Sequence, residues 1–581
     1  MLNNRKSTNK LFNFTNLLVC SFLVLGLVGM VNHELWLDEM QAWMIATDSS
    51  SIADLLNNLK YEGHPALWYL CLRFLNGLID NPFIMQVFHL IVATINIAIF
   101  VVFSPFNRLQ KLLFTFGYFP FYEYSILSRN YNLGVLLIFS FCALFFIRKT
   151  SYFPLAIIIA LLAHTNAFGL IFAIALQLTL LLETFIEPNP ISFKRWDFLA
   201  SFFIVVFSIM GAIVQLIPPA SGVQGNLIAP DTTVWQTIFA QVSNLNRLME
   251  LISNVWKAYF PIYQFSPLLK DIALISLSII FSAIAFKVPT RRSSIKFVYL
   301  AISILLIILI AIDKSNKLTI LEIVNTTAML GALVSLTILF FLGSWFIKQP
   351  VILFLYVSGS LGFFLFTYSI YYSDNLRHTG HFFLLFIVCY WLQKSKEHSY
   401  RILPIKPLRA LTAKDKSKVV TVILIIHLIT GIIAYTNDII RPFSMSKVTA
   451  NYIENTGLDT LPIMGVPDEF VSAISGYLDR EIYYPQGDRW GSFVIWDNQR
   501  RYVTAEEIVE PSESRQLIKR NILKQVNEIV QENPTDVLLI STAPINFKIP
   551  SFKITSIKEF TANTIGREKS YRLYLIEKAN R

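Results

Sequence analysis

A succession of long apolar runs constrains the fold of this chain more than any other feature. Several runs extend over about 18 residues or more, the length at which an α-helix begins to cross the hydrocarbon core of a bilayer. Of the 581 residues, 54% are hydrophobic and only 15% are charged, and the mean hydropathy is +0.53. Soluble domains contain about 25% charged residues. The sequence therefore predicts an α-helical polytopic membrane protein.

The positive charges of the chain predict its orientation. The formal net charge is +11, but Lys and Arg gather in short loops on alternate sides of the apolar runs. That pattern is typical of membrane topology rather than of nucleic-acid binding. Arg5, Lys6 and Lys10 place the N-terminus in the cytoplasm, and the most basic stretch, 394–418, belongs on the same side. We expect membrane lipids as partners and no nucleic acid.

The positive-inside rule gives about thirteen transmembrane helices, with the N-terminus inside and the C-terminus outside. The segment 66–79 is predicted to lie flat as an interfacial amphipathic helix, because counting it as a span would move every later basic loop outside. The predicted spans are 11–32, 82–103, 112–122, 133–147, 153–163, 168–185, 198–217, 268–286, 298–312, 328–346, 351–372, 382–392 and 420–435.

From about Asn437 the composition changes to that of a soluble α/β domain. The chain is therefore divided into a transmembrane domain, 1–436, and an extracytoplasmic α/β domain, 437–581. A helix is predicted over 516–531, and two alternating strands near the C-terminus fit an antiparallel edge. The predicted strands are 461–466, 493–496, 536–541, 552–560 and 571–576. No Gly-rich phosphate loop or metal-ligand spacing occurs there, so we expect a structural or acceptor-contacting cap.

The segment 33–65 forms the outer acidic loop and is predicted to be the floor of an active site. It concentrates acids and also carries Trp36 and Trp43, although a loop that only joins two spans needs neither. Asp38 and Glu39 stand beside the outer end of the first span, where a carboxylate is costly to desolvate. Both are catalytic candidates, with Asp38 as the general base that takes a proton from an incoming hydroxyl. The alternative is a pair of solvated loop carboxylates.

Glu62 and His64 form a second group in the same loop. Gly63 and Pro65 predict a turn that presents both side chains at a fixed geometry. His64 is a candidate for holding a phosphate oxygen or, together with Glu62, a divalent metal ion. Two ligands do not define a metal site, so metal dependence stays open. The alternative is a hydrogen-bonded turn histidine.

Cationic and aromatic residues recur at the outer ends of later spans. They are Arg129 and Tyr131 after the third span, and Arg377, His378 and His381 after the eleventh. A guanidinium group binds two phosphate oxygens at once through two N–H groups, and it stays charged. These positions therefore suit an anionic lipid headgroup. Ordinary interfacial snorkelling is the alternative. His164, at another outer turn, is an equally good candidate for an interfacial or a site histidine.

Three short motifs together resemble a known family. They are W-x-D-E after the first span (Trp36, Asp38, Glu39), H-P (His64-Pro65), and S-R-x-Y after the third span (Ser128, Arg129, Tyr131). With the span count and the external C-terminal domain, they resemble the GT-C superfamily of polyprenyl-phosphate-dependent glycosyltransferases. The nearest group is the protein O-mannosyltransferase and aminoarabinose-transferase-like one, glycosyltransferase family 39 and its relatives. Motifs carry the resemblance over roughly the first 180 residues, and layout alone carries it beyond.

The resemblance implies an inverting transfer of a sugar from a polyprenyl-phosphate donor to a glycan, lipid or protein acceptor. The reaction would take place on the outer face of a bacterial inner membrane. Asp38 would be the base, while Arg129, Arg377 and His64 would steady the departing phosphate. Many relatives place an Asp shortly after the arginine that follows the third span. Here Asn130, Tyr131 and Asn132 follow Arg129, and the nearest acid is Glu123.

Two other functions stay open. A lipid-linked sugar flippase or other transporter would place ionisable residues near mid-span and show internal repeats. In this chain the charges cluster at the outer ends of spans, and no repeat is found. The other alternative is a non-catalytic membrane assembly protein whose external domain binds a partner.

Overall fold

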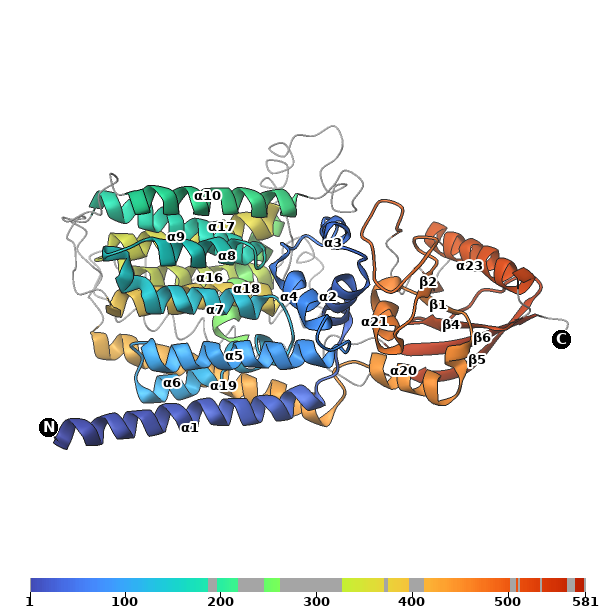
Figure 1. Cartoon of the computed structure of the whole chain (residues 1–581), viewed down its shortest axis with the longest axis horizontal. Coiled ribbons are helices and arrows are strands. Elements are labelled where there is room, and N and C mark those ends of the chain that lie inside the picture. Colours follow the sequence, from blue (N-terminus) through green and yellow to red (C-terminus); the bar gives the residue numbers. More distant parts are fainter. Residues whose placement is uncertain are drawn as a thin grey trace.

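The computed structural model describes residues 2–186, 196–217, 245–261, 326–369, 375–395, 412–501, 508–509, 512–532, 535–561 and 570–578. A bundle of roughly parallel and antiparallel helices forms one part of the molecule, and an α/β domain is attached to one end of it (Figure 1). The predicted spans 268–286 and 298–312 lie outside the described residues.

Eight helical stretches of the described chain are long and apolar enough to cross a membrane. The helical membrane class predicted from the sequence agrees with these helices. A short 3-10 turn extends α7 over Phe145–Lys149, and another extends α16 over Ser344–Phe346. The long helices are α1 (Leu2–Asn32), α5 (Phe83–Phe103), α7 (Tyr131–Leu144), α9 (Ala167–Ile186), α10 (Trp196–Leu216), α16 (Thr326–Gly343), α17 (Pro350–Ser369) and α19 (Ala413–Ile440).

Three predicted spans fall on other helices. The segment 112–122 is covered by α6 (Arg108–Thr115) and the π-helix η1 (Tyr118–Glu123), and 153–163 coincides with the short α8 (Phe153–Ala163). The segment 382–392 lies inside α18 (Leu376–Ser395), where every residue from Phe382 to Leu392 is buried. A helix enclosed by other helices does not face lipid, so its start can carry polar side chains. Two further short helices are α12 (Leu245–Ser253) and α13 (Val255–Tyr259).

Three short helices cover the end of the bundle that faces the α/β domain (Figure 1). They are α2 (Leu37–Asp48), α3 (Ile52–Leu59) and α4 (Leu67–Asn76). Helix α4 has 10 residues, whereas crossing a bilayer takes about 20. It packs on α2 through an apolar cluster that includes Trp43, Trp68 and Leu72. This agrees with the expectation that 66–79 does not span.

The C-terminal domain is built on a six-stranded sheet of order β3-β2-β1-β4-β6-β5. Strand β1 is parallel to β2 and β4, and the outer strands are antiparallel. Helix α23 (Glu513–Glu532) covers one face, and α20 (Ser446–Asn455) and α21 (Asp468–Leu478) cover the other. A 3-10 turn, η7 (Leu458–Thr460), follows α20. The strands are β1 (Ile463–Val466), β2 (Ile482–Tyr484), β3 (Arg489–Gly491), β4 (Val537–Ser541), β5 (Phe552–Phe560) and β6 (Tyr571–Lys578).

The structure corrects one predicted strand in this region and adds two short strands to the sheet. The predicted strand 493–496 is wrong: the segment is irregular and lies against α2, so its apolar character reflects docking rather than strand pairing. The short strands β2 and β3 were not predicted. Helix α19 continues to Ile440, so the expected boundary between 436 and 437 falls within its last turns.

Candidate active site

Asp38 lies between two arginines that come from distant parts of the chain. It is the second residue of α2, Arg129 lies just before α7, and Arg377 is the second residue of α18. The Oδ2 atom of Asp38 is 2.5 Å from an Nη1 atom of each arginine. The Asp38 side chain is 23% exposed, against 12% and 11% for the two arginines. The structure thus brings together the three predicted residues and leaves the carboxylate partly exposed to solvent.

Aromatic rings support both guanidinium groups. The Cζ atom of Arg377 is 5.7 Å from the centre of the Trp36 ring, and that of Arg129 is 6.0 Å from the Tyr131 ring. These separations suit a cation–π attraction. The Tyr131 hydroxyl lies 2.8 Å from Nε2 of His378, which joins the start of α7 to the start of α18. The site is therefore held across the bundle and not along one loop.

Glu39 has a different environment from its neighbour Asp38. Its side chain is wholly buried, and its Oε1 accepts the backbone N–H of Ser128 at 2.5 Å. Its Oε2 lies 3.0 Å from Nε2 of His33 and also accepts the N–H of Trp36. An enclosed carboxylate with all these partners does not reach a substrate. These surroundings do not favour the catalytic role expected for Glu39.

His33 was not among the residues predicted for the site. It lies between two carboxylates, with Nδ1 2.8 Å from Oδ2 of Asp438 and Nε2 3.0 Å from Glu39. Burial of the ring opposes protonation, but the charges of Asp438 and Glu39 outweigh it and raise the pKa of His33 to about 10. His33 is consequently a cation at neutral pH. Its position just after an apolar span was a signal that could have found it.

A polar face of α5 holds the loops that carry the site. The amide of Gln86 donates to the carbonyls of Met30 and His33. His89 accepts the N–H of Arg129 at Nε2, 3.2 Å away, and its Nδ1 lies 3.0 Å from the carbonyl of Ser125. A polar side chain inside a membrane helix costs free energy. Gln86 and His89 offset this cost through hydrogen bonds to backbone groups. The sequence signal was their presence within the predicted span 82–103.

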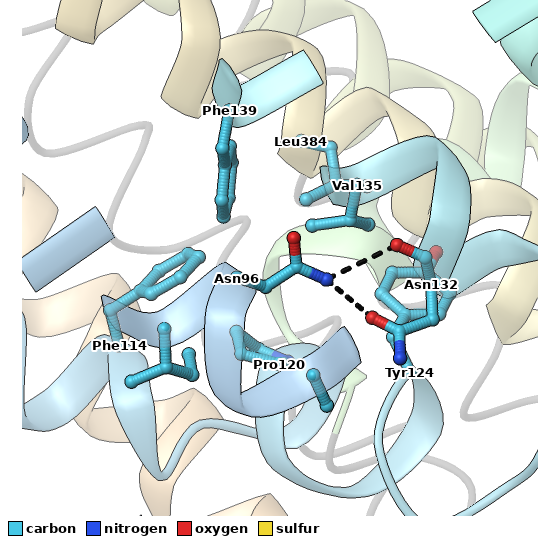
Figure 2. A pocket seen from close by; sticks show the side chains of 10 residues that line it. Asn96, Phe114, Pro120, Tyr124, Asn132, Val135, Phe139 and Leu384 are labelled. Carbon is cyan, nitrogen blue, oxygen red and sulfur yellow. Dashed lines mark hydrogen bonds between the residues drawn. The ribbon is translucent and has the colours of Figure 1, made fainter. Parts of the chain in front are cut away.

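The same face continues inward to Asn96, which borders a small, mostly apolar hollow (Figure 2). Its amide nitrogen donates to the backbone carbonyl of Asn132 at 3.1 Å and also contacts the side-chain oxygen of Asn132. The Asn132 amide donates in turn to the carbonyl of His89 at 2.9 Å. These bonds fix the first turn of α7, which begins two residues after Arg129.

Glu62 and His64 lie beside the site, each in buried surroundings of its own. The Glu62 carboxylate accepts bonds from Gln41 and Trp496, and burial raises the pKa of Glu62 to about 7. Burial and the charge of Arg377 lower the pKa of His64 to about 4, so its ring is neutral. The Nδ1 atom of His64 is buried and has no hydrogen-bond partner among the described residues. Within that part of the chain no group of three or more His, Cys, Asp or Glu residues suits a metal ion.

The remaining predicted residues have separate surroundings. His381 stacks on Phe168 with ring centres 4.3 Å apart, one turn beyond His378. Glu123 is buried in η1 and accepts the hydroxyl of Tyr118 at 2.5 Å. His164 ends α8, where its Nδ1 lies 3.5 Å from the amide of Gln215. We assign none of these three a direct part in chemistry.

The C-terminal domain docks on the helix that carries Asp38. The Gln41 amide of α2 donates to the carbonyl of Val494 at 2.7 Å and accepts its N–H at 2.9 Å. The Tyr477 hydroxyl of α21 donates to the carbonyl of Leu35 at 2.9 Å. A Cβ at Gly476 of α21 would come within 3.0 Å of the Met44 sulfur, so the two helices approach closely. Helix α2 is therefore fixed from both sides.

Two guanidinium groups and one carboxylate leave one positive charge in excess at an accessible point of the bundle's end. This excess positive charge suits a phosphate, because each guanidinium group can bind two phosphate oxygens at once. Comparisons with protein-family models, with curated proteins and with solved structures find no match to this chain.

Proposed function

We propose that this protein is an integral-membrane inverting glycosyltransferase. It moves a sugar from a polyprenyl-phosphate donor to a hydroxyl group of an acceptor on the extracytoplasmic side. The observation that supports this best is the Asp38 carboxylate held between Arg129 and Arg377 at one end of an apolar bundle. There a prenyl tail stays among the helices and lipids while its phosphate reaches the two arginines.

The reaction is a single displacement at the anomeric carbon. The acceptor oxygen forms the new bond to that carbon as the bond to the phosphate oxygen breaks, and the electron pair leaves with the phosphate. Asp38 takes the proton of the acceptor hydroxyl. The arginines stabilise the charge that develops on polyprenyl phosphate, and the neutral His64 ring offers one more hydrogen bond. One displacement inverts the configuration at the sugar.

Asp38 must leave the arginines before it acts as a base. A carboxylate bound by two guanidinium groups is stabilised in its charged form and accepts a proton poorly. A donor phosphate competes for the same guanidinium groups, and its arrival releases Asp38 toward the acceptor. The donor is therefore expected to bind before the acceptor.

The test is sugar transfer by the purified protein in proteoliposomes supplied with polyprenyl-phosphate sugars and a panel of acceptors. We expect Asp38→Asn to lower turnover by about 10²-fold or more, because the base is lost. The matched control is Asp48→Asn, the same change at the exposed end of the same helix. Near-normal turnover by a folded Asp38→Asn protein would remove Asp38 from the mechanism.

A lipid-linked sugar transporter is the second candidate. The buried polar residues Gln86, His89 and Asn96 inside the bundle favour it, since transport paths are lined by such groups. Each of the three, however, bonds the backbone of a neighbouring segment. Movement of the donor across proteoliposomes with no covalent product would establish this candidate in place of the transferase.

A further inference from the structure

A second charged cluster lies beneath the ion pair of Asp38 and is closed to solvent. We infer that Asp438, His33 and Glu39 form a positioning triad that holds Arg129 in place to bind the donor phosphate. This inference rests on the proposed function, since it names how the phosphate-binding arginine is held. The three side chains are enclosed by protein, so their part is to fix geometry.

The triad is connected to Asp38 and to Arg129 through the residues next to them in the chain. His33 joins Asp438, 2.8 Å away, to Glu39, 3.0 Å away. Glu39 directly follows Asp38 on α2, and its other oxygen accepts the N–H of Ser128, which directly precedes Arg129. A displacement of Glu39 therefore moves the carboxylate and the guanidinium group together. The second arginine is supported through aromatic rings: Phe443, five residues after Asp438, meets Trp36 edge to face, and the Trp36 ring lies under Arg377.

Packing alone does not account for these residues. The side chains of His33 and Glu39 are 0% exposed and that of Asp438 is 4% exposed, and apolar side chains of the same volume often serve a core equally well. Asp438 also lies in the last turn of α19, the end of a helix where a negative charge is unfavourable. A costly arrangement of this kind is expected where a fixed geometry matters more than stability.

The charges of the two clusters balance. Asp38, Arg129 and Arg377 together carry one excess positive charge. The triad carries one excess negative charge, because His33 is a cation between two carboxylates. The triad thus offsets the repulsion between two guanidinium groups that both contact one oxygen atom. It lets the arginines stay in place in the absence of a phosphate.

Asp438→Asn tests the triad because it keeps the size of the side chain and removes its charge. The readout is binding of polyprenyl phosphate in detergent, measured from the rise in the thermal unfolding temperature. We expect binding to weaken by about tenfold in the wild-type background and by less than about twofold when Arg129 is already Lys. The matched control is Glu34→Gln, a partly buried carboxylate beside His33 that makes no bond to Glu39; its binding stays within about twofold of wild type.

Equal losses in the two backgrounds would overturn the inference, because a structural charge acts without regard to Arg129. Should Asp438→Asn not fold, Asp438→Glu keeps the charge and changes only the distance. A folded Asp438→Glu protein is expected to bind polyprenyl phosphate several-fold more weakly, and wild-type affinity would overturn the triad. If the wild type binds the phosphate but transfers no sugar, the glycosyltransferase proposal fails while the triad stands.

Discussion

A single oxygen atom of Asp38 contacts both Arg129 and Arg377. The carboxylate therefore competes with any other anion for these two arginines. Nη1 of Arg129 and Nη1 of Arg377 each lie 2.5 Å from it. Loss of an ordinary phosphate-binding residue weakens phosphate binding, whereas loss of a competing carboxylate strengthens it. Affinity for the donor phosphate and catalysis should therefore respond oppositely to the removal of the Asp38 charge.

We expect Asp38→Asn to bind polyprenyl phosphate about tenfold more tightly than wild type, because the competing carboxylate no longer occupies the arginines. Arg377→Ala should bind it at least about tenfold more weakly. Thermal unfolding in the presence of increasing polyprenyl phosphate measures both. The control, Asp48→Asn, should match wild type. Weaker binding by Asp38→Asn would instead make the carboxylate part of the donor site.

The meeting of Asp38, Arg129 and Arg377 could be predicted because each is a charged side chain at the end of an apolar run. A charge in that position is too costly to leave without a partner. The roles of Asp38 and Glu39 could not be separated in this way. Consecutive residues of a helix point about 100° apart, so one faces the arginines and the other faces the buried His33. Only tertiary contacts decide which of the two residues faces the arginines.

The pairing of His33 with Asp438 was beyond sequence reasoning for a different reason. The two residues are 405 positions apart, and no spacing or periodicity connects them. Their contact follows from the packing of α1 beside α19, which depends on the surfaces of whole helices. Local patterns predict such helices well and their neighbours poorly.

At the scale of elements, Glu62 joins three parts of the chain. It lies in the turn between α3 and α4, and it accepts bonds from Gln41 of α2 and from Trp496 of the C-terminal domain. Burial raises the pKa of Glu62 from 4.5 to about 7. The native protein therefore holds this proton over a pH range in which the unfolded chain releases it, so ionisation costs stability.

As the pH rises from about 4.5 to about 7, the wild type should lose about 1–3 kcal/mol of unfolding free energy relative to Glu62→Gln. Above that range the difference in unfolding free energy between the two proteins should stay constant, because Glu62 is then ionised in both the folded and the unfolded state. Denaturant unfolding at a series of pH values measures it. Glu454→Gln, an exposed change of the same kind on α20, should follow the wild type throughout. A difference that shrinks with rising pH would contradict the raised pKa.

The misassigned segment 493–496 and the enclosed position of α18 were beyond the sequence for the same reason. The segment 493–496 is apolar because it lies against α2, and α18 is enclosed because other helices surround it. In both cases the burial comes from a partner far away in the sequence. Apolar runs show that a segment is covered but do not identify what covers it. The strongly periodic helix α23 and the edge pair β5–β6 agree with prediction because their patterns are local.

For the whole molecule, the arrangement of the two ends of the chain limits the topology. The N-terminus lies at the end of the bundle opposite the α/β domain, while α2, α3 and α4 lie beside that domain (Figure 1). A chain that starts at one end of a bundle and leaves it at the other crosses an odd number of times. Adding 66–79 to the thirteen predicted spans would make their number even, and the positive-inside rule also speaks against it.

Reporter fusions should therefore divide into two groups. Alkaline phosphatase, which folds only outside the cytoplasm, is expected to be active when fused after Asn81 or after Arg441. Green fluorescent protein is expected to fluoresce when fused after Lys149 or after Lys394, since basic residues stay inside. The fusion after Asn81 discriminates best, because α4 with its 10 residues is too short to cross a bilayer. A fluorescent fusion at that point would mean that 66–79 does cross. Asp38 would then still lie outside, but the basic loops that follow α5 would lie outside with it, against the positive-inside rule.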